Sequence, residues 1–578
     1  MDRLTQRTPA SWANLGTAPR TMRFGARSRM WRDRFIVRRL EDQGTTQRFL
    51  RSPSRSGLKA AIPVAVSECT PASWRKPRRL LWIGLLGLCL APVLAYGHIG
   101  TQNVVLESSQ PPNPVRVIIR PPGVVPGLAD IDVRVLTNGV RRVTVLPVHW
   151  RAGLAGAPPP DLARPVPGDN ELYHAQLWLM ARGAYSVHVK VETAHGTNTV
   201  IVPVNSLATT RLGMTNNLVG VLIGLGLLLF ALGISIVGAA VRESILKPGV
   251  TASPRRVWWG RASVGIAGVL LALALERGHA WWKAEDADYR HNGLHQPVAC
   301  QGVVVNEGNQ RLLRINIQTN EGRASWSSLV PDHGKLMHVF LMREPQLDVL
   351  AHLHPARRSR VQFEAVLPPM PAGDYRLYAD VTHETAFSQT LTTLAQVPSI
   401  PVPPGSPAGS GVAADPDDSW FQGRPVEGGN ESQMGGGWIM KWDRPPSLGV
   451  RRETTLRFQV LQPDGGLARL EPYVGMLGHA AIRREDGSVF THLHPAGSVS
   501  LAAQQVFQIR AGDHAPKRIT PEMMEKYCLP PTGDSLQQPL SFPYEFPQPG
   551  RYLIWVQVKA AGQARTGVFA GTVENSSK

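Results

Sequence analysis

The segment GHAAIRREDGSVFTHLHP, residues 478–495, predicts a β-hairpin on which the interpretation of the whole chain depends. At its centre is Asp486-Gly487, a dipeptide typical of a two-residue type I′ turn. With that turn, His479 lies directly opposite His494, and His492 lies two residues before His494 on the same strand. Because side chains alternate between the two faces of a strand, all three histidines point to one face of the hairpin.

A second segment, HVFLMREPQLDVLAHLHP at residues 338–355, repeats this pattern. It has one more residue between the outer histidines, and a three-residue loop restores a pairing in which His338 faces His354. His352 shares their face of the hairpin, as does Met342. The two hairpins together give the expected metal ligands, which are His338, His352, His354, Met342, His479, His492 and His494.

Three neutral imidazoles on one face are a ligand set that suits zinc, copper or nickel. A methionine thioether beside them favours copper, since thioethers are soft ligands for Cu(I). Copper is therefore the expected cofactor, and zinc is the alternative. The competing interpretation is structural, with the His-x-His-Pro sequence ending a strand and each imidazole hydrogen-bonded to neighbouring backbone. Two copies with the same facing histidines favour the metal, and His333 and His383 are expected to be incidental.

The rest of the chain predicts a mainly β protein. With 55 Gly, 49 Pro and only 18% charged residues in 578, it is not a coiled coil, a helical repeat array or a wholly disordered chain. Four cysteines exclude a disulfide scaffold. Alternating apolar and polar runs predict three extracytoplasmic immunoglobulin-like or cupredoxin-like β-sandwiches, at 98–206, 300–397 and 436–573. The Pro-, Gly- and Ser-rich composition that begins at 398 makes 398–435 an extended linker.

Two apolar segments predict transmembrane helices, at 214–241 and 258–282. Leu218–Val241 has 24 residues without a charge, enough to cross ~30 Å of hydrocarbon. The second segment has only a 14-residue apolar stretch, but Trp pairs flank it like the aromatic residues at a membrane interface. The loop at 242–257 carries four basic residues and one acidic one, so the positive-inside rule makes it cytoplasmic and puts 98–206 and 283–578 outside. If the second segment does not span, the C-terminal half is cytoplasmic instead.

Most of the net positive charge lies at the N-terminus, where residues 1–79 carry +13 of the total of +19. A nucleic-acid-binding arm is one interpretation, but this tract runs directly into an apolar stretch at 80–96. A basic region, a short apolar run and Val93-Leu94-Ala95 are together typical of a secretory signal or signal anchor. Residues 1–79 are accordingly expected to be disordered or an over-extended reading frame, with no nucleic-acid partner. If the apolar stretch is retained, the protein has three membrane spans.

The layout resembles that of bacterial membrane-anchored β-sandwich proteins of the YtkA-like and FixH-like type. The resemblance rests on an external β-region followed by membrane helices, on the Gly-x-Tyr-x-Val-x-Val strand at 183–189 and on the His-x-His-Pro motif. This motif is similar to one in uncharacterised bacterial membrane proteins of the same layout. The resemblance implies a role in envelope copper handling or cytochrome oxidase assembly at a bacterial inner membrane.

Three functions stay open at this point. The first is a non-enzymatic, membrane-anchored, periplasmic metal-binding protein that exchanges its ion with a donor or acceptor protein. The second is a structural or partner-binding envelope protein whose histidines only stabilise the fold. The third is a zinc-dependent hydrolase, because three histidines with an open position are also the catalytic zinc pattern. Glu344 and Glu485 lie near the hairpin turns rather than beside the histidines, so no catalytic residue is predicted.

Overall fold

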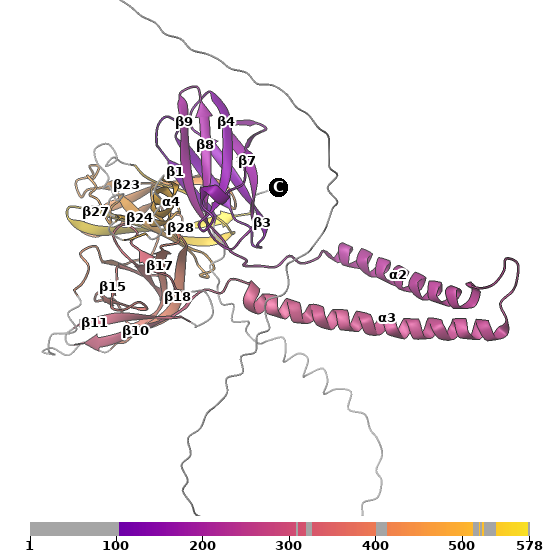
Figure 1. Ribbon diagram of the computed structural model, residues 1–578. Coiled ribbons are helices and arrows are strands. Elements are labelled where there is room, and N and C mark those ends of the chain that lie inside the picture. The colour runs from indigo at the N-terminus through magenta and orange to yellow at the C-terminus, as the bar shows by residue number, and fades with distance from the viewer. Residues whose placement is uncertain are drawn as a thin grey trace, which may run out of the picture. The chain divides into compact units, whose positions relative to one another are not determined.

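The computed structural model describes residues 103–575 except 308–309, 320–325, 400–412, 513–518, 521–522 and 525–538. The expected basic tract and signal segment at 1–96 lie outside the described residues. The described part contains six β-sheets, which form three sandwiches, and two long helices that extend away from them as a pair (Figure 1). The mainly β fold class is therefore confirmed.

The first sandwich builds its core from evenly spaced valines and isoleucines. One sheet has the strand order β1-β2-β3-β7-β6, and the other has the order β5-β4-β8-β9. Every second residue of β3 is buried, as a strand with one covered face requires. The elements are β1 (Val104–Ser108), β2 (Val115–Arg120), β3 (Gly127–Val135), β4 (Val140–His149), η1 (Leu154–Gly156), β5 (Asp161–Leu162), β6 (Arg164–Val166), β7 (Asp169–Leu179), β8 (Gly183–Thr193) and β9 (Gly196–Ser206).

The second sandwich contains the first predicted histidine hairpin, β13–β14. Its sheets have the orders β10-β11-β16-β15 and β12-β17-β13-β14-β19, and β18 also pairs with β17. The strands are β10 (Ala299–Glu307), β11 (Gln310–Gln318), β12 (Leu329–Val330), β13 (His338–Glu344), β14 (Val349–Leu353), β15 (Ala356–Arg357), β16 (Gln362–Val366), β17 (Gly373–His383), β18 (Ser388–Val397) and β19 (Ser419–Gln422).

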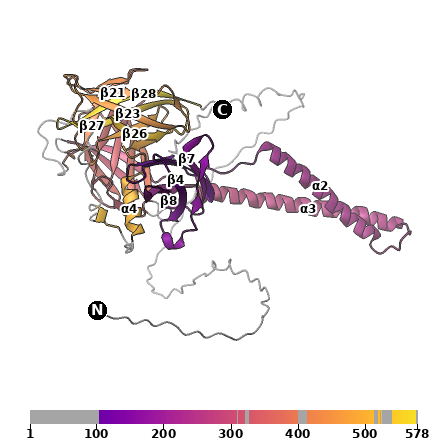
Figure 2. The ribbon, with the colours of Figure 1, turned by 90° about the horizontal axis from the view of Figure 1, so that it is seen from above.

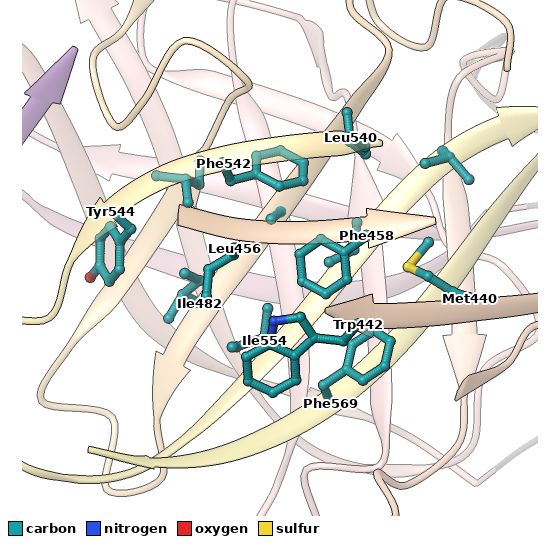
Figure 3. Packing of buried hydrophobic residues seen from close by; sticks show 14 of the residues in the cluster. Met440, Trp442, Leu456, Phe458, Ile482, Leu540, Phe542, Tyr544, Ile554 and Phe569 are labelled. Carbon is teal, nitrogen blue, oxygen red and sulfur yellow. The ribbon is translucent and has the colours of Figure 1, made fainter. Parts of the chain in front are cut away.

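The third sandwich contains the second hairpin, β24–β25, and has the orders β20-β21-β23-β26 and β22-β28-β27-β24-β25. Its core is rich in aromatic rings, with Trp442, Phe458 and Phe569 packed between the sheets (Figure 3). The elements are β20 (Glu431–Gln433), β21 (Ile439–Asp443), β22 (Leu448–Gly449), β23 (Glu453–Leu461), β24 (Gly478–Arg484), β25 (Phe490–Leu493), α4 (Leu501–Ala511), β26 (Leu540–Glu545), β27 (Gly550–Ala560) and β28 (Gln563–Glu574).

The expected linker at 398–435 is wrong over its second half. Strand β19 lies within it and forms the edge of the second sandwich, with Leu350 paired to Phe421. The reason is a local change in composition, since Ser419-Trp420-Phe421-Gln422 is a short β-prone run after the Pro- and Gly-rich stretch. This strand brings an acidic loop, Asp415–Asp418, beside the first histidine hairpin.

The two predicted spans are helices α2 (Asn216–Glu243) and α3 (Pro254–Asp288), and a 40-residue stretch, Pro254–Gly293, is helical when the π-turn η2 (Tyr289–Gly293) is included. Both are long and apolar enough to cross a membrane. They lie side by side (Figure 2), and Gly238 allows a close contact between them, because a Cβ there would lie 2.5 Å from a Val264 methyl group. Small residues at such a contact are typical of paired membrane helices.

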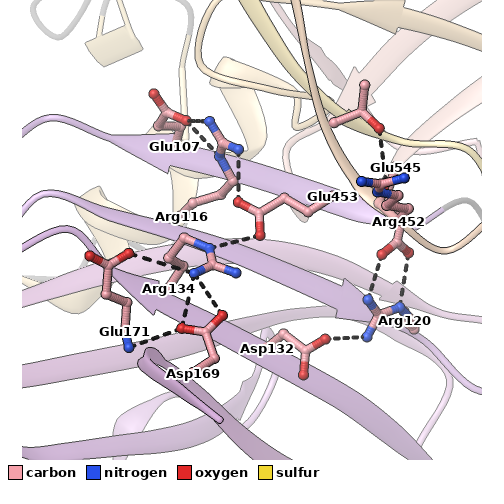
Figure 4. Close-up of polar contacts among 11 residues, drawn as sticks. Glu107, Arg116, Arg120, Asp132, Arg134, Asp169, Glu171, Arg452, Glu453 and Glu545 are labelled. Atoms are coloured by element: carbon pink, nitrogen blue, oxygen red, sulfur yellow. Dashed lines mark hydrogen bonds and ion pairs between the residues drawn. The ribbon is translucent and has the colours of Figure 1, made fainter. Parts of the chain in front are cut away.

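The first and third sandwiches are joined by ion pairs (Figure 4). Glu453 of β23 accepts from Arg116 and Arg134 of the first sandwich, at 2.8 Å in each case. Glu545 of β26, whose side chain is buried, accepts from Arg120 at 2.9 Å. Helix α4 also reaches the first sandwich, where it packs in a shared apolar cluster. The domain that precedes α2 and a domain that follows α3 are therefore in contact.

Candidate metal centre

The two histidine hairpins pack against each other through their outer faces. Along β13, Val339 and Leu341 point into the core of the second sandwich, whereas Phe340 and Met342 point the other way. The outward set packs in an apolar cluster with residues of the third sandwich, such as Trp555. The histidines on these outer faces are consequently enclosed between two sandwiches rather than exposed to solvent.

The predicted strand registers are confirmed in both hairpins. Phe340 pairs with His352, and Ala481 pairs with His492. The predicted type I′ turn is wrong, because only Gly487 has a positive φ there. The Asp486 carboxylate accepts from the Ser488 backbone N–H at 3.0 Å, an Asx turn that holds the tip in a four-residue loop. The longer loop still keeps the register, since Arg484 N–H donates to the Val489 carbonyl.

The structure brings six of the seven predicted ligands into one cluster and adds a seventh histidine. His338 and His492, from different sandwiches, have ring centroids 5.2 Å apart. The added residue is His333, whose ring lies 4.6 Å from that of His494. All seven side chains are nearly or completely inaccessible to solvent, and His492 is the most exposed at 7%. The sequence predicted two separate sites, but the structure has one shared centre.

The remaining candidates lie elsewhere. Met342 is buried in the apolar cluster beside the centre, where its neighbours are aliphatic and aromatic side chains. His383 packs against Trp326 and hydrogen-bonds to Ser327 and Gln389, outside the cluster. His333 lies on the tight turn Asp332–Lys335, five residues before His338, and the turn at Tyr473–Met476 has the same spacing from His479. This repeated turn before each hairpin is the signal in the sequence that would have identified His333 as a member of the cluster.

Hydrogen bonds at the outer edge of the cluster assign the histidine tautomers. His338 Nε2 lies 3.0 Å from the Asp332 carbonyl, and His479 Nε2 lies 3.0 Å from the Tyr473 carbonyl. A carbonyl oxygen only accepts, so each Nε2 carries the hydrogen. The Nδ1 atom of each ring therefore presents a lone pair to the inside of the cluster.

The middle histidine of each hairpin turns its Nδ1 atom toward an acceptor of the other sandwich. His352 Nδ1 lies 2.9 Å from Gln557 Oε1, which is an acceptor because the Gln557 amide nitrogen donates to Ser419. His492 Nδ1 lies 3.5 Å from a carboxylate oxygen of Asp380. Each of these Nδ1 atoms faces an acceptor on the other sandwich, and each Nε2 atom therefore faces inward as a lone pair.

The last histidine of each hairpin follows the same rule. His354 Nδ1 lies 3.0 Å from Asp418, and His494 Nδ1 lies 3.2 Å from the Val499 carbonyl. His354 Nε2 is buried and has no hydrogen-bond partner among the residues that the structure describes. His494 Nε2 lies 3.2 Å from His333 Nε2, a pair that one hydrogen can satisfy.

Two pairs of inward nitrogens thus meet with no hydrogen between them. His338 Nδ1 is 3.3 Å from His352 Nε2, and His479 Nδ1 is 3.1 Å from His492 Nε2. In each pair two acceptors face each other at hydrogen-bond distance, an arrangement that a cation between them would stabilise. Metal-ligating histidines typically donate their other ring N–H to a carbonyl or carboxylate, as these rings do.

Burial keeps these rings neutral, the state in which imidazole binds metals. Desolvation lowers the pKa of His333 to about 4 and that of His494 to about 3. Burial, together with repulsion between neighbouring imidazoles, also holds the pKa of four further rings well below the usual value of histidine; these are His338, His352, His479 and His492. Near neutral pH these rings therefore gain no additional proton that could form a hydrogen bond between the two facing nitrogens.

Two sets of three histidines have donor atoms within 4.8 Å of one another. The first is His338, His352 and His492, which combines both sandwiches, and the second is His479, His492 and His494. A third set, formed by His354 with Asp415 and Asp418, already has a cation at its edge. The Lys335 ammonium lies 2.6 Å from Asp415.

Two partly buried carboxyl groups border the centre. Burial raises the pKa of Asp380 to about 7, and it also raises the pKa of Asp332. Asp332 accepts from the first turn of α4, through Ala502 N–H at 3.1 Å. Negative charge next to the imidazoles would favour a bound cation.

Comparison with known proteins gives a family match but no function. Residues 295–397 and 434–575 match the family model for a domain of unknown function, DUF8832. These segments cover the second sandwich except β19 and the third except β20, and they contain all seven histidines of the cluster. No curated protein matches the chain.

Solved structures share only distant similarity with the chain. Dimeric latent PorU from Porphyromonas gingivalis matches at 8% identity over 82% of this chain and 34% of its own, with a TM-score of 0.12. The fibronectin(III)-like modules of Clostridium thermocellum CbhA match at 10% identity over 48% and 92%, with a TM-score of 0.12. The ICAM-5 D1–D4 ectodomain fragment matches at 8% identity over 78% and 74%, with a TM-score of 0.13. This chain spans about a third of the PorU chain, and scores this low carry no argument about function.

Proposed function

We propose that this protein binds a transition metal ion in the seven-histidine centre, and that it holds this centre outside the cytoplasm on a membrane anchor. One observation carries the proposal: neutral imidazole lone pairs from two domains converge, while every outer N–H assigned above faces an acceptor. Histidines that only stabilise a fold would use both ring nitrogens in hydrogen bonds. Here the inward nitrogens of four paired rings, and Nε2 of His354, lack a donor among the residues that the structure describes.

Copper is the proposed ion, with zinc the alternative. Imidazole-only ligand sets suit both metals, and affinity for nitrogen ligands in general is higher for Cu²⁺ than for Zn²⁺. The thioether of Met342 gives no support, since it packs in the apolar cluster. The preference for copper therefore rests on the imidazoles alone.

Contact between domains on either side of the helices supports the anchored arrangement. Ion pairs join the first and third sandwiches, so both lie on one side of any membrane. An even number of crossings between them is then required, which α2 and α3 together would provide. The basic loop between α2 and α3 favours a cytoplasmic turn, with the sandwiches in the periplasm and the helices in the inner membrane.

The test is metal binding by the full chain in detergent, because neither C-terminal sandwich alone contains the whole centre. Competition titrations with Cu(I), Cu(II) and Zn(II) would compare the protein with a His479/His492/His494→Ala variant. The matched control replaces His149, His174 and His195 of the first sandwich by Ala. We expect tight binding that only the first variant loses. Equal binding by all three proteins, or none by the unmodified protein, would overturn the proposal.

A further inference from the structure

A cavity of about 550 Å³ lies against the histidine centre, at the junction of all three sandwiches. Its walls come from the end of β9 in the first sandwich, from β17 and β18 in the second and from the β25–α4 segment in the third. An ion with six waters occupies roughly 200 Å³, at about 30 Å³ per water. The cavity is therefore large enough for a hydrated ion.

The cavity reaches three of the seven histidines, His338, His492 and His494. His492 belongs to both sets of three ligands and is the most exposed ring of the cluster. The other four histidines do not line the cavity. The centre is thus open to the cavity at the ligand that both sets share.

The chemistry of the wall suits a cation. Among the described lining residues, Asp332 and Asp380 are acidic and lie beside the histidines. The wall also has two basic residues, and each is ion-paired with a carboxylate that does not line the cavity: Lys335 with Asp415, and Arg290 with Asp286. Many of the other lining groups are hydroxyls and amides, for example Thr392 and Ser500. Such oxygens can replace water around a moving ion one ligand at a time, and the imidazoles then provide the tighter final site.

The cavity is also lined by the segments through which the two long helices join the β-domains. Leu207 and Thr209 line it a few residues before α2 begins, and Leu294 and His295 line it just after α3 and η2 end. His295 N–H donates to the Ala208 carbonyl at 2.7 Å, which ties these two connecting segments together. The cavity consequently connects the centre with the side of the protein from which the helices extend.

From this geometry we infer that the cavity is the passage through which a metal ion enters and leaves the histidine centre, from the side that carries the helices. The inference rests on the proposed function and adds a route to it. The affinity for the ion depends only on the free energies of the free and the bound protein. A passage instead determines how fast the ion is taken up and released. Narrowing the passage should therefore slow uptake and release by the same factor.

The experiment uses the full chain and places a bulky ring in the passage from either wall, by Thr392→Trp or by Leu207→Trp. The matched control is Leu394→Trp, two residues along β18 at a side chain that is 54% exposed and does not line the cavity. Stopped-flow mixing with Cu(II) or Zn(II), and with excess chelator, measures uptake and release. Competition titration measures affinity.

At least one wall variant should slow both rates tenfold or more with affinity within about threefold of the unmodified protein, while Leu394→Trp changes neither rate. Native rates in both wall variants at native affinity would overturn the passage and leave the proposed function standing. A slower release with unchanged uptake would also overturn the passage, because it would mean that the substitution stabilises the metal-bound state and does not obstruct the route of the ion. Absence of metal binding by the unmodified protein would overturn both.

Discussion

The second and third sandwiches present nearly the same histidine arrangement to each other, and they differ in the residues around it. His338 and His479 occupy equivalent strand positions, and each donates to a carbonyl six residues upstream. Four positions further along, Met342 of one sandwich corresponds to Arg483 of the other. The two sandwiches thus share the inward lone pairs but differ in the packing around them. This indicates that the arrangement of the ligands, more than that of the surrounding side chains, is fixed at the interface.

The largest expected effect tests whether both sandwiches hold the ion. His338→Asn and His479→Asn should each lower metal affinity by on the order of 10²–10³-fold, since a three-ligand set loses one member from a total of roughly 10–16 kcal/mol. Competition titration would measure the loss, with the half-exposed His174→Asn as control. Normal affinity in either variant would mean that one sandwich binds the metal alone.

The second-largest effect on metal affinity is expected from removing a side chain that faces a histidine Nδ1 atom across the interface. Gln557→Leu and Asp380→Leu remove the partners of His352 Nδ1 and His492 Nδ1. Each should reduce affinity about 10–100-fold, because such partners fix the tautomer and orientation of a ligating ring. Gln557→Glu and Asp380→Asn keep an acceptor oxygen of similar size and should retain most of the affinity. Unchanged affinity in both Leu variants would contradict the assigned tautomers.

A smaller effect is expected where the sandwiches differ in charge. Arg483 is 1% exposed, and it donates to Glu344 at 2.5 Å and to the Tyr378 hydroxyl at 2.9 Å. Arg483→Met, which copies the residue of the other sandwich, should lower the free energy of unfolding by about 1–2 kcal/mol, since it leaves a half-buried Glu344 without this partner. Urea unfolding would measure this, and adding Glu344→Gln should recover part of the loss.

The smallest effect concerns the seventh histidine. His333 and Val474 occupy equivalent turn positions, with φ of 51° and 46°. His333→Asn should lower affinity less than about tenfold, because Asn tolerates this backbone conformation and His494 keeps its lone pair. Val474→Asn is the matched change that removes no imidazole, and its titration curve should overlay that of the unmodified protein. A hundredfold loss for His333→Asn would instead make it a full ligand.

Local pattern was enough to predict the hairpins, their registers and the two apolar helices, because strand alternation and hydrophobic length are read from neighbouring residues. The packing of one hairpin against the other was not predicted, since it joins residues about 140 apart. One signal was present: Val339-Phe340-Leu341-Met342 is apolar on both faces, which is typical of a strand covered on both sides. The turn at Asp486-Gly487 was missed because a side-chain hydrogen bond outweighed the preference of the dipeptide.

The two halves of the centre belong to one chain, joined by the segment between β19 of the second sandwich and β20 of the third. Separate subunits would have to meet at a concentration that favours pairing, whereas tethered halves have an effective concentration of the order of millimolar for short flexible connections. Formation of the centre should therefore be independent of how much protein the cell contains. Tethering also releases the halves from the need to be identical, so that one can have His333 and Met342 where the other has Val474 and Arg483.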